Sequence, residues 1–221
     1  MAEVETQENL QIAIHRRYNP EGLTQFNIVP GLLGVILQMT MVMMTAMALT
    51  REIERGTMEN LLAMPATAFE IMIGKVFPFI VVGLVQVMVV LSVAKLLFAV
   101  PFFGSLGLLL VAIFIYITAL VLLGYTFSTM AKSQMQAMQL TFFFFLPSIL
   151  LSGFMFPFRG MPGWAQTIGE ALPLTHFLRI IRAIMLKGSD FAAVSHEMLA
   201  LSAFALAFAL IALLRFRRTL D

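Results

Sequence analysis

The 221-residue chain is 60% hydrophobic and 12% charged, with a mean hydropathy of +0.94. Soluble domains are about half apolar and a quarter charged, so this composition predicts an all-α integral membrane protein. It holds no Cys, which excludes disulfides and thiolate metal sites. The net charge of +2 does not indicate nucleic acid, because the basic residues are scattered at the ends of apolar runs.

Residues 1–28 are polar and lack the basic start and short apolar core of a signal peptide, so the first true span must direct insertion. We expect this segment to be extracytoplasmic and residues 29–221 to form a transmembrane domain.

Five apolar runs are each long enough to cross a hydrocarbon core of about 30 Å. They are expected at about 29–50, 71 (or 75)–98, 106–127, 137–156 and 198–214. Gln86 in the second run is expected to hydrogen-bond to a neighbouring helix, a reading favoured over substrate contact. Pro147 is expected to break or bend the fourth span.

A charged segment, residues 51–75, separates the first two spans. Gly56 can end one helix and Thr57 can cap the next, with Glu59 near the positive end of the new helix dipole. Pro65 stops this second helix after about two turns. A helix this short, with a small apolar face, is poorly stable alone in water, so the pattern favours docking on a partner. The alternative is a solvated turn that only separates the spans.

Residues 157–190 are too polar to span and too apolar to stand free in solvent. Pro162 can open a short helix containing Trp164, and Thr175 can cap a second helix that ends at Gly188. This pattern predicts an interfacial or re-entrant helical hairpin, with the indole at headgroup depth.

A candidate substrate path combines methionines of the first span with the proline-containing fourth span, because broken helices in transporters often lie near the pathway. Its residues are Met39, Met43, Met47, Phe143 and Pro147. Flexible thioethers suit surfaces that accept many shapes. Contact with lipid or neighbouring helices is the favoured reading of the methionines, and packing alone explains the phenylalanines.

Two blocks of residues resemble the ABC-2 type exporter permeases. The first block is Arg51-Glu52, Glu54-Arg55-Gly56-Thr57, Glu59, Leu61-Leu62, Pro65 and Gly74-Lys75. The second is Ser152-Gly153-Phe154-Met155-Phe156-Pro157, Met161-Pro162, Trp164, Pro173-Leu174-Thr175-His176 and Lys187-Gly188. The resemblance covers roughly Asn19 to the C-terminus. In that family the first block is a cytoplasmic coupling helix that sits in a groove of the ATP-binding subunit.

The resemblance implies a permease that moves an amphiphilic or hydrophobic substrate outward with ATP hydrolysed elsewhere. It implies an ATP-binding cassette subunit and a second permease copy or paralogue as partners, in a lipid bilayer and without nucleic acid. This chain would carry no cofactor, with ATP and Mg on the partner. The implied contacts to the ATPase subunit are Glu52, Glu54, Arg55, Gly56, Thr57, Glu59, Leu61 and Leu62.

In the family, a first transmembrane helix and most of an extracytoplasmic domain precede the segment resembling residues 18–20. The sequence is shorter than that pattern, and a natural short form and a truncation both remain open.

The sequence holds no complete catalytic motif, which argues against an enzyme. Gly74-Lys75 lacks the rest of a phosphate-binding loop, and His196-Glu197 lacks the second His of a zinc protease helix. The three histidines are expected at the surface or interface. The alternatives left open are a channel or scaffold without ATP coupling and, less favoured, a membrane enzyme. An adjacent gene for an ATP-binding cassette would favour the exporter.

Lys and Arg divide seven against seven between the two sides, so charge does not decide the orientation. The resemblance implies an extracytoplasmic N-terminus and a cytoplasmic C-terminus in a prokaryotic inner membrane.

Overall fold

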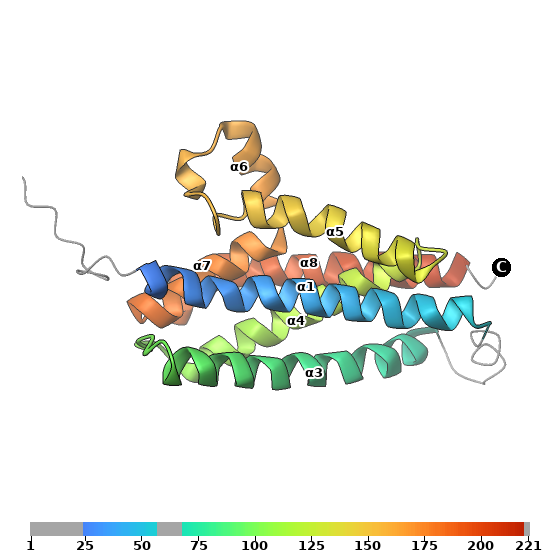
Figure 1. Ribbon diagram of the computed structural model, residues 1–221, viewed down its shortest axis with the longest axis horizontal. Helices are drawn as coiled ribbons and strands as arrows, with labels where there is room; N and C mark the ends of the chain where they lie inside the picture. Colours follow the sequence, from blue (N-terminus) through green and yellow to red (C-terminus); the bar gives the residue numbers. More distant parts are fainter. Residues whose placement is uncertain (1–23, 57–67, 219–221) are drawn as a thin grey trace, which may run out of the picture.

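The computed structural model describes residues 24–56 and 68–218, and all the regular structure in these two ranges is helical. The helices are α1 (Thr24–Glu54), α3 (Ala68–Leu96), α4 (Leu106–Ser128), α5 (Gln134–Leu151), the 3₁₀ turn η1 (Phe158–Gly160), α6 (Gly163–Glu170), α7 (Pro173–Lys187) and α8 (Phe191–Arg218). The long helices lie side by side in one bundle, and α6 projects from it beside one end of α5 (Figure 1).

Five of these helices, α1, α3, α4, α5 and α8, are long and apolar enough to cross a membrane. The predicted all-α integral membrane fold is therefore confirmed. The second and third spans begin and end within a few residues of the predicted bounds. The fourth span stops at Leu151 rather than near 156, and the last helix begins at Phe191, seven residues before the predicted start.

The bundle has two distinct ends (Figure 1). At one end α1 finishes, α3 and α5 begin, and α8 finishes; we call this the link end, because residues 57–67 connect α1 to α3 there. At the other, the far end, α3 finishes, α4 begins and α7 packs across the bundle.

Helix α4 lies at the centre of the bundle, packed against α1, α3, α7 and α8. Tyr116 is fully buried and stacks on Phe177 of α7, with ring centroids 4.1 Å apart and planes 4° from parallel. Such a pair contributes about 0.5–1.5 kcal/mol beyond its buried area. At Gly124 the backbones of α1 and α4 approach so closely that a Cβ would lie 2.7 Å from the Val42 carbonyl oxygen.

Gln86 lies half-buried in the middle of α3, and its Oε1 accepts a hydrogen bond from the Thr40 hydroxyl of α1 at 2.9 Å. The prediction that this amide bonds to a neighbouring helix is confirmed. In a lipid environment one such bond contributes on the order of 1 kcal/mol.

Pro147 does not break α5, which continues through it to Leu151. A proline removes one intrahelical donor, and the residues on both sides of Pro147 keep their helical conformation. In the following turn the Ser148 hydroxyl donates to the Phe144 carbonyl at 2.8 Å. The helix ends at Ser152 and Gly153, whose φ of +84° is a left-handed conformation that suits glycine.

The predicted helical hairpin is formed by α6 and α7. Helix α6 follows Pro162, and Trp164 in its first turn is 67% exposed. Helix α7 ends at Gly188, which adopts φ +63° as a helix C-cap. Its apolar side is fully buried against α1, α4 and α8, so α7 is part of the bundle core.

The start of α7 differs from the prediction. Its first helical residue is Pro173, which suits that position because its missing N–H has no intrahelical partner there. Thr175 lies inside the helix, and its hydroxyl donates to the carbonyl of Gly169 at 2.6 Å. The threonine therefore joins α7 to α6 instead of capping α7.

Candidate functional site

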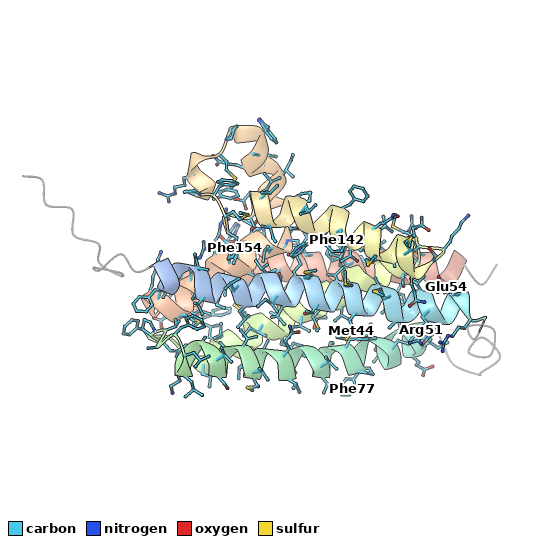
Figure 2. The ribbon with its side chains drawn as sticks, in the orientation of Figure 1. Met44, Arg51, Glu54, Phe77, Phe142 and Phe154 are labelled. Carbon is cyan, nitrogen blue, oxygen red and sulfur yellow. The ribbon has the colours of Figure 1, made fainter. Side chains whose placement is uncertain are left out.

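The link end of α1 carries a compact group of charged residues (Figure 2). The helix closes with two backbone bonds, from Arg55 N–H to Arg51 O and from Gly56 N–H to Ile53 O, each 3.1 Å long. Gly56 has φ +67°, and a Cβ there would meet nothing within 4 Å. The glycine is thus needed for its backbone conformation, and the prediction that it ends the helix is confirmed.

Glu54, in the last turn of α1, binds the start of α5. Its Oε1 accepts the backbone N–H of Gln134 at 2.8 Å, and its Oε2 accepts the Gln134 side-chain amide at 2.6 Å. The first N–H groups of a helix have no intrahelical acceptor, and the helix dipole is positive there. A carboxylate from α1 therefore caps α5, alongside the ordinary cap in which Ser133 Oγ accepts from Gln136 N–H at 3.2 Å.

Glu52 joins the same end of α1 to α3 through an ion pair with Lys75. The lysine side chain is only 11% exposed, so this pair is screened less by water than a pair on an open surface. Two carboxylates two residues apart on α1 thus bind two different helices, and the ends of α1, α3 and α5 are joined at the link end.

The residues predicted to contact an ATPase subunit divide into two groups. Glu52 and Glu54 make the contacts above, and Arg55 and Gly56 lie exposed where α1 ends. The other four, Thr57, Glu59, Leu61 and Leu62, lie outside the described residues. Contact of all eight with another subunit stays a prediction.

The candidate substrate-path residues also lie on two helices. Met39, Met43 and Met47 are half-buried at four-residue intervals along one side of α1. Phe143 and Pro147 share one side of α5 and are exposed, the phenylalanine by 76%. Two described cavities, one between α3 and α4 and one between α5 and α6, are lined by other residues. Their part in a pathway stays a prediction.

The far end holds a second charged group that the sequence did not predict. His176 is 5% exposed, so the expectation of a surface or interfacial histidine is wrong for this residue. Its Nδ1 lies 2.5 Å from Glu197 Oε2 of α8, and its Nε2 lies 2.9 Å from the Glu170 carbonyl oxygen of α6. Both ring nitrogens therefore face oxygen atoms, one from α8 and one from α6.

Arg179, one turn further along α7, completes this group. It donates to both carboxylate oxygens of Glu170, at 3.0 and 2.5 Å, and to Glu197 Oε1 at 3.2 Å. The guanidinium also lies 4.6 Å from the centre of the Phe158 ring. Hydrogen bonding to Arg179 holds the pKa of Glu170 below its ordinary value, and hydrogen bonding to Glu170 raises the pKa of Arg179.

One sequence signal could have indicated this group: His176 and Arg179 are three residues apart, so they share a face of one helix. Their partners Glu170 and Glu197 come from other helices, and no spacing in the sequence relates them. In the described residues no cluster of three or more His, Asp or Glu side chains is arranged to hold a metal ion.

The sequence profile described as ABC-2 type transporter matches residues 6–186. The chain is 34% identical over 182 residues to the probable multidrug ABC transporter permease YbhR of Escherichia coli, an alignment that covers 82% of this chain and 50% of the relative. It is 37% identical over 193 residues to the E. coli inner membrane transport permease YhhJ, covering 86% and 52%. With the E. coli probable multidrug ABC transporter permease YbhS the identity is 30% over 213 residues, covering 95% and 56%. The chain therefore spans about half the length of the curated relatives that it matches.

Proposed function

The chain belongs to the ABC-2 type transporter family, and on that premise we propose that it is the membrane permease part of an exporter driven by ATP on a separate subunit. The ATP and Mg would bind that partner, an ATP-binding cassette protein. The contact would be made by the link end, through Glu52, Glu54, Arg55, Gly56, Thr57, Glu59, Leu61 and Leu62.

The observation that carries this proposal is the linkage of three spans at one end. Residues 57–67 connect α1 to α3 directly, and Glu52 and Glu54 bind α1 to Lys75 of α3 and Gln134 of α5. A displacement of this connection therefore acts on three spans together. A flexible tether without such contacts would absorb the displacement.

ATP can bias the permease only through contacts that differ between two of its states. Closure of the partner's nucleotide-binding units would shift the link end, and the joined ends of α1, α3 and α5 would transmit the shift to the spans. Alternation between inward and outward exposure would follow. A second permease copy or a paralogue would complete the translocation path.

The substrate that we propose is amphiphilic or hydrophobic. The path would run beside Met39, Met43 and Met47 of α1 and beside Phe143 and Pro147 of α5. The flexible methionines adapt to many apolar shapes. Two of the similar E. coli proteins carry the word multidrug in their names, which agrees with a broad substrate range.

Two variants of the connection test the coupling role. Glu59→Lys and Leu61→Asp are each expected to abolish co-purification with the ATPase subunit and substrate-stimulated ATP turnover, while membrane insertion stays intact. Asp190→Lys, the same charge reversal on an exposed residue at the far end, is the matched control and should leave turnover unchanged. Unaltered turnover in both link-end variants would refute the coupling role and favour a channel or scaffold.

We propose that the link end and the C-terminus face the cytoplasm of a prokaryotic cell. The chain contains no Cys, so a single Thr57→Cys variant carries one reactive thiol in its own sequence. In sealed right-side-out vesicles an impermeant thiol reagent should leave it unlabelled until the vesicles are opened. Labelling before opening would reverse the orientation and remove the basis for contact with a cytoplasmic ATPase.

A further inference from the structure

A cavity of about 510 Å³ lies at the far end of the bundle, between the last turns of α3, residues 100–102 and the start of α4. Its volume falls in the range of about 300–1,000 Å³ typical of small-molecule sites. The segment that closes it is fixed in place, because the Phe103 N–H donates to the Met185 carbonyl of α7 at 3.1 Å. The cavity is thus bounded by α3, by the start of α4 and by a loop that is hydrogen-bonded to α7.

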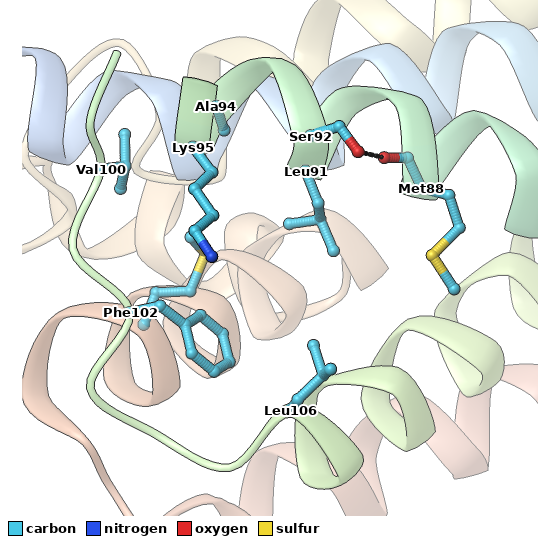
Figure 3. A pocket seen from close by; sticks show the side chains of 9 residues that line it. Met88, Leu91, Ser92, Ala94, Lys95, Val100, Phe102 and Leu106 are labelled. Atoms are coloured by element: carbon cyan, nitrogen blue, oxygen red, sulfur yellow. Dashed lines mark hydrogen bonds between the residues drawn. The ribbon is translucent and has the colours of Figure 1, made fainter. Parts of the chain in front are cut away.

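The wall of the cavity is mostly apolar. Met88 and Leu91 come from α3, Phe102 from the following loop, Leu106 from the first turn of α4 and Met185 from α7. Figure 3 shows these α3 and α4 side chains extending into the space between the two helices. Ser92 adds little polarity, since its hydroxyl donates within its own helix to the Met88 carbonyl at 2.7 Å.

Lys95 is the charged residue of this wall, and its side chain extends from α3 toward Phe102 (Figure 3). No carboxylate lines the cavity in the described part of the chain. The site therefore carries a positive charge over an apolar space. An ammonium group beside apolar surface is complementary to an amphiphile with an anionic head.

The arrangement also has a direction. Met88, Leu91 and Lys95 follow one another at intervals of three and four residues, so they share one face of α3. Along the helix axis the lysine lies about 10 Å beyond Met88, at a rise of about 1.5 Å per residue. Because Lys95 is in the last turn of a membrane span, the charge lies toward the headgroups and the apolar stripe runs toward the bilayer centre.

We propose that this cavity binds a bilayer phospholipid with an anionic headgroup, its phosphate paired with the Lys95 ammonium and one acyl chain lying along Leu91 and Met88. The site is separate from the link end and does not depend on the proposed coupling to ATP. A lysine that only reaches the headgroup region would also attract anionic headgroups, but without a site beneath it no acyl chain would lie inside the cavity.

The test places a fluorescent reporter in the wall. Trp164 is the one tryptophan of the sequence, so Trp164→Phe with Phe102→Trp gives a chain with a single indole at the cavity. The purified full chain is reconstituted in phosphatidylcholine containing 20% phosphatidylglycerol, with bromine on the acyl chains of one lipid or the other. Quenching should show a roughly fivefold preference for phosphatidylglycerol, the contribution of one lysine near a membrane surface.

Lys95→Met and Lys95→Gln should each abolish this preference, so that the two lipids quench equally, and Lys95→Arg should retain it. Lys132→Met is the matched control, because it removes the same charge from an exposed residue at the link end, and it should keep the fivefold preference. Equal quenching by the two lipids in the reporter chain would overturn the proposal. A fivefold preference that survives in both neutral Lys95 variants would overturn it as well.

Discussion

Replacement of Gly124 by Ala should loosen the contact between α1 and α4. A Cβ at this position would lie 2.7 Å from the Val42 carbonyl oxygen and 2.9 Å from the Thr45 Cβ. To reach an ordinary contact of 3.4 Å, the helices must separate locally by about 0.7 Å. A gap of this size removes about a quarter to a half of the dispersion energy of the atoms along it.

The expected net effect is a loss of about 1–2 kcal/mol in the free energy of unfolding. Overpacking of a tight contact costs about 1–3 kcal/mol, and alanine returns up to about 1 kcal/mol through its better helix propensity. The assay is unfolding of the purified chain in mixed micelles of rising SDS content, followed by circular dichroism.

Gly74→Ala is the matched control, because Gly74 is also inside a span and a Cβ there meets nothing within 4 Å. This variant should be as stable as the parent or slightly more stable. If Gly124→Ala unfolds at the same SDS content as Gly74→Ala, the close approach of α1 and α4 is refuted.

Three further predictions concern charged contacts. Glu54→Ala should lower transport per ATP hydrolysed by roughly two- to thirtyfold, and Gln134→Ala should do the same; a double variant worse than either single one would show that they act separately. Glu52→Lys or Lys75→Glu alone should impair coupled ATP turnover, and the double variant, which restores an ion pair with the charges exchanged, should recover it. A double variant as impaired as the single ones would show that the ion pair does not matter for coupling. Because the pKa of Glu170 is lowered, its contribution is present at neutral pH and is lost as the pH falls through that pKa. Glu170→Gln should therefore unfold more easily at pH 7, by at most about 1 kcal/mol after screening, and should match the parent once the pH lies below the lowered pKa of Glu170. A difference that stays constant as the pH falls would contradict this.

The spans could be predicted from the sequence because length and hydropathy determine them directly. Lipid offers no partner for an open backbone, so an apolar run of this length must be helical. The start of α8 could not be predicted, because charged residues lie in its first turns. His196 and Glu197 make its first turns look too polar for a span, and hydropathy does not register that Glu197 is paired with His176 and Arg179.

The candidate site shows a similar division. Gly56 could be assigned to the end of α1, since the glycine conformation that ends a helix is a local property of the chain. The partners of Glu54 and Glu52 could not be assigned. Gln134 follows Glu54 by 80 residues and Lys75 follows Glu52 by 23, and which helices meet depends on packing that no local pattern encodes.

The charged group at the far end restricts how the bundle can rearrange. His176 and Arg179 of α7 contact Glu170 of α6 and Glu197 of α8, so hydrogen bonds and ion pairs join three helices. Pulling any of the three away would break these contacts, among them the Arg179–Glu197 ion pair, whose carboxylate side chain is only 19% exposed. Helices α6, α7 and α8 should therefore travel as a single rigid unit, and any opening at this end must occur along its borders with the remaining spans.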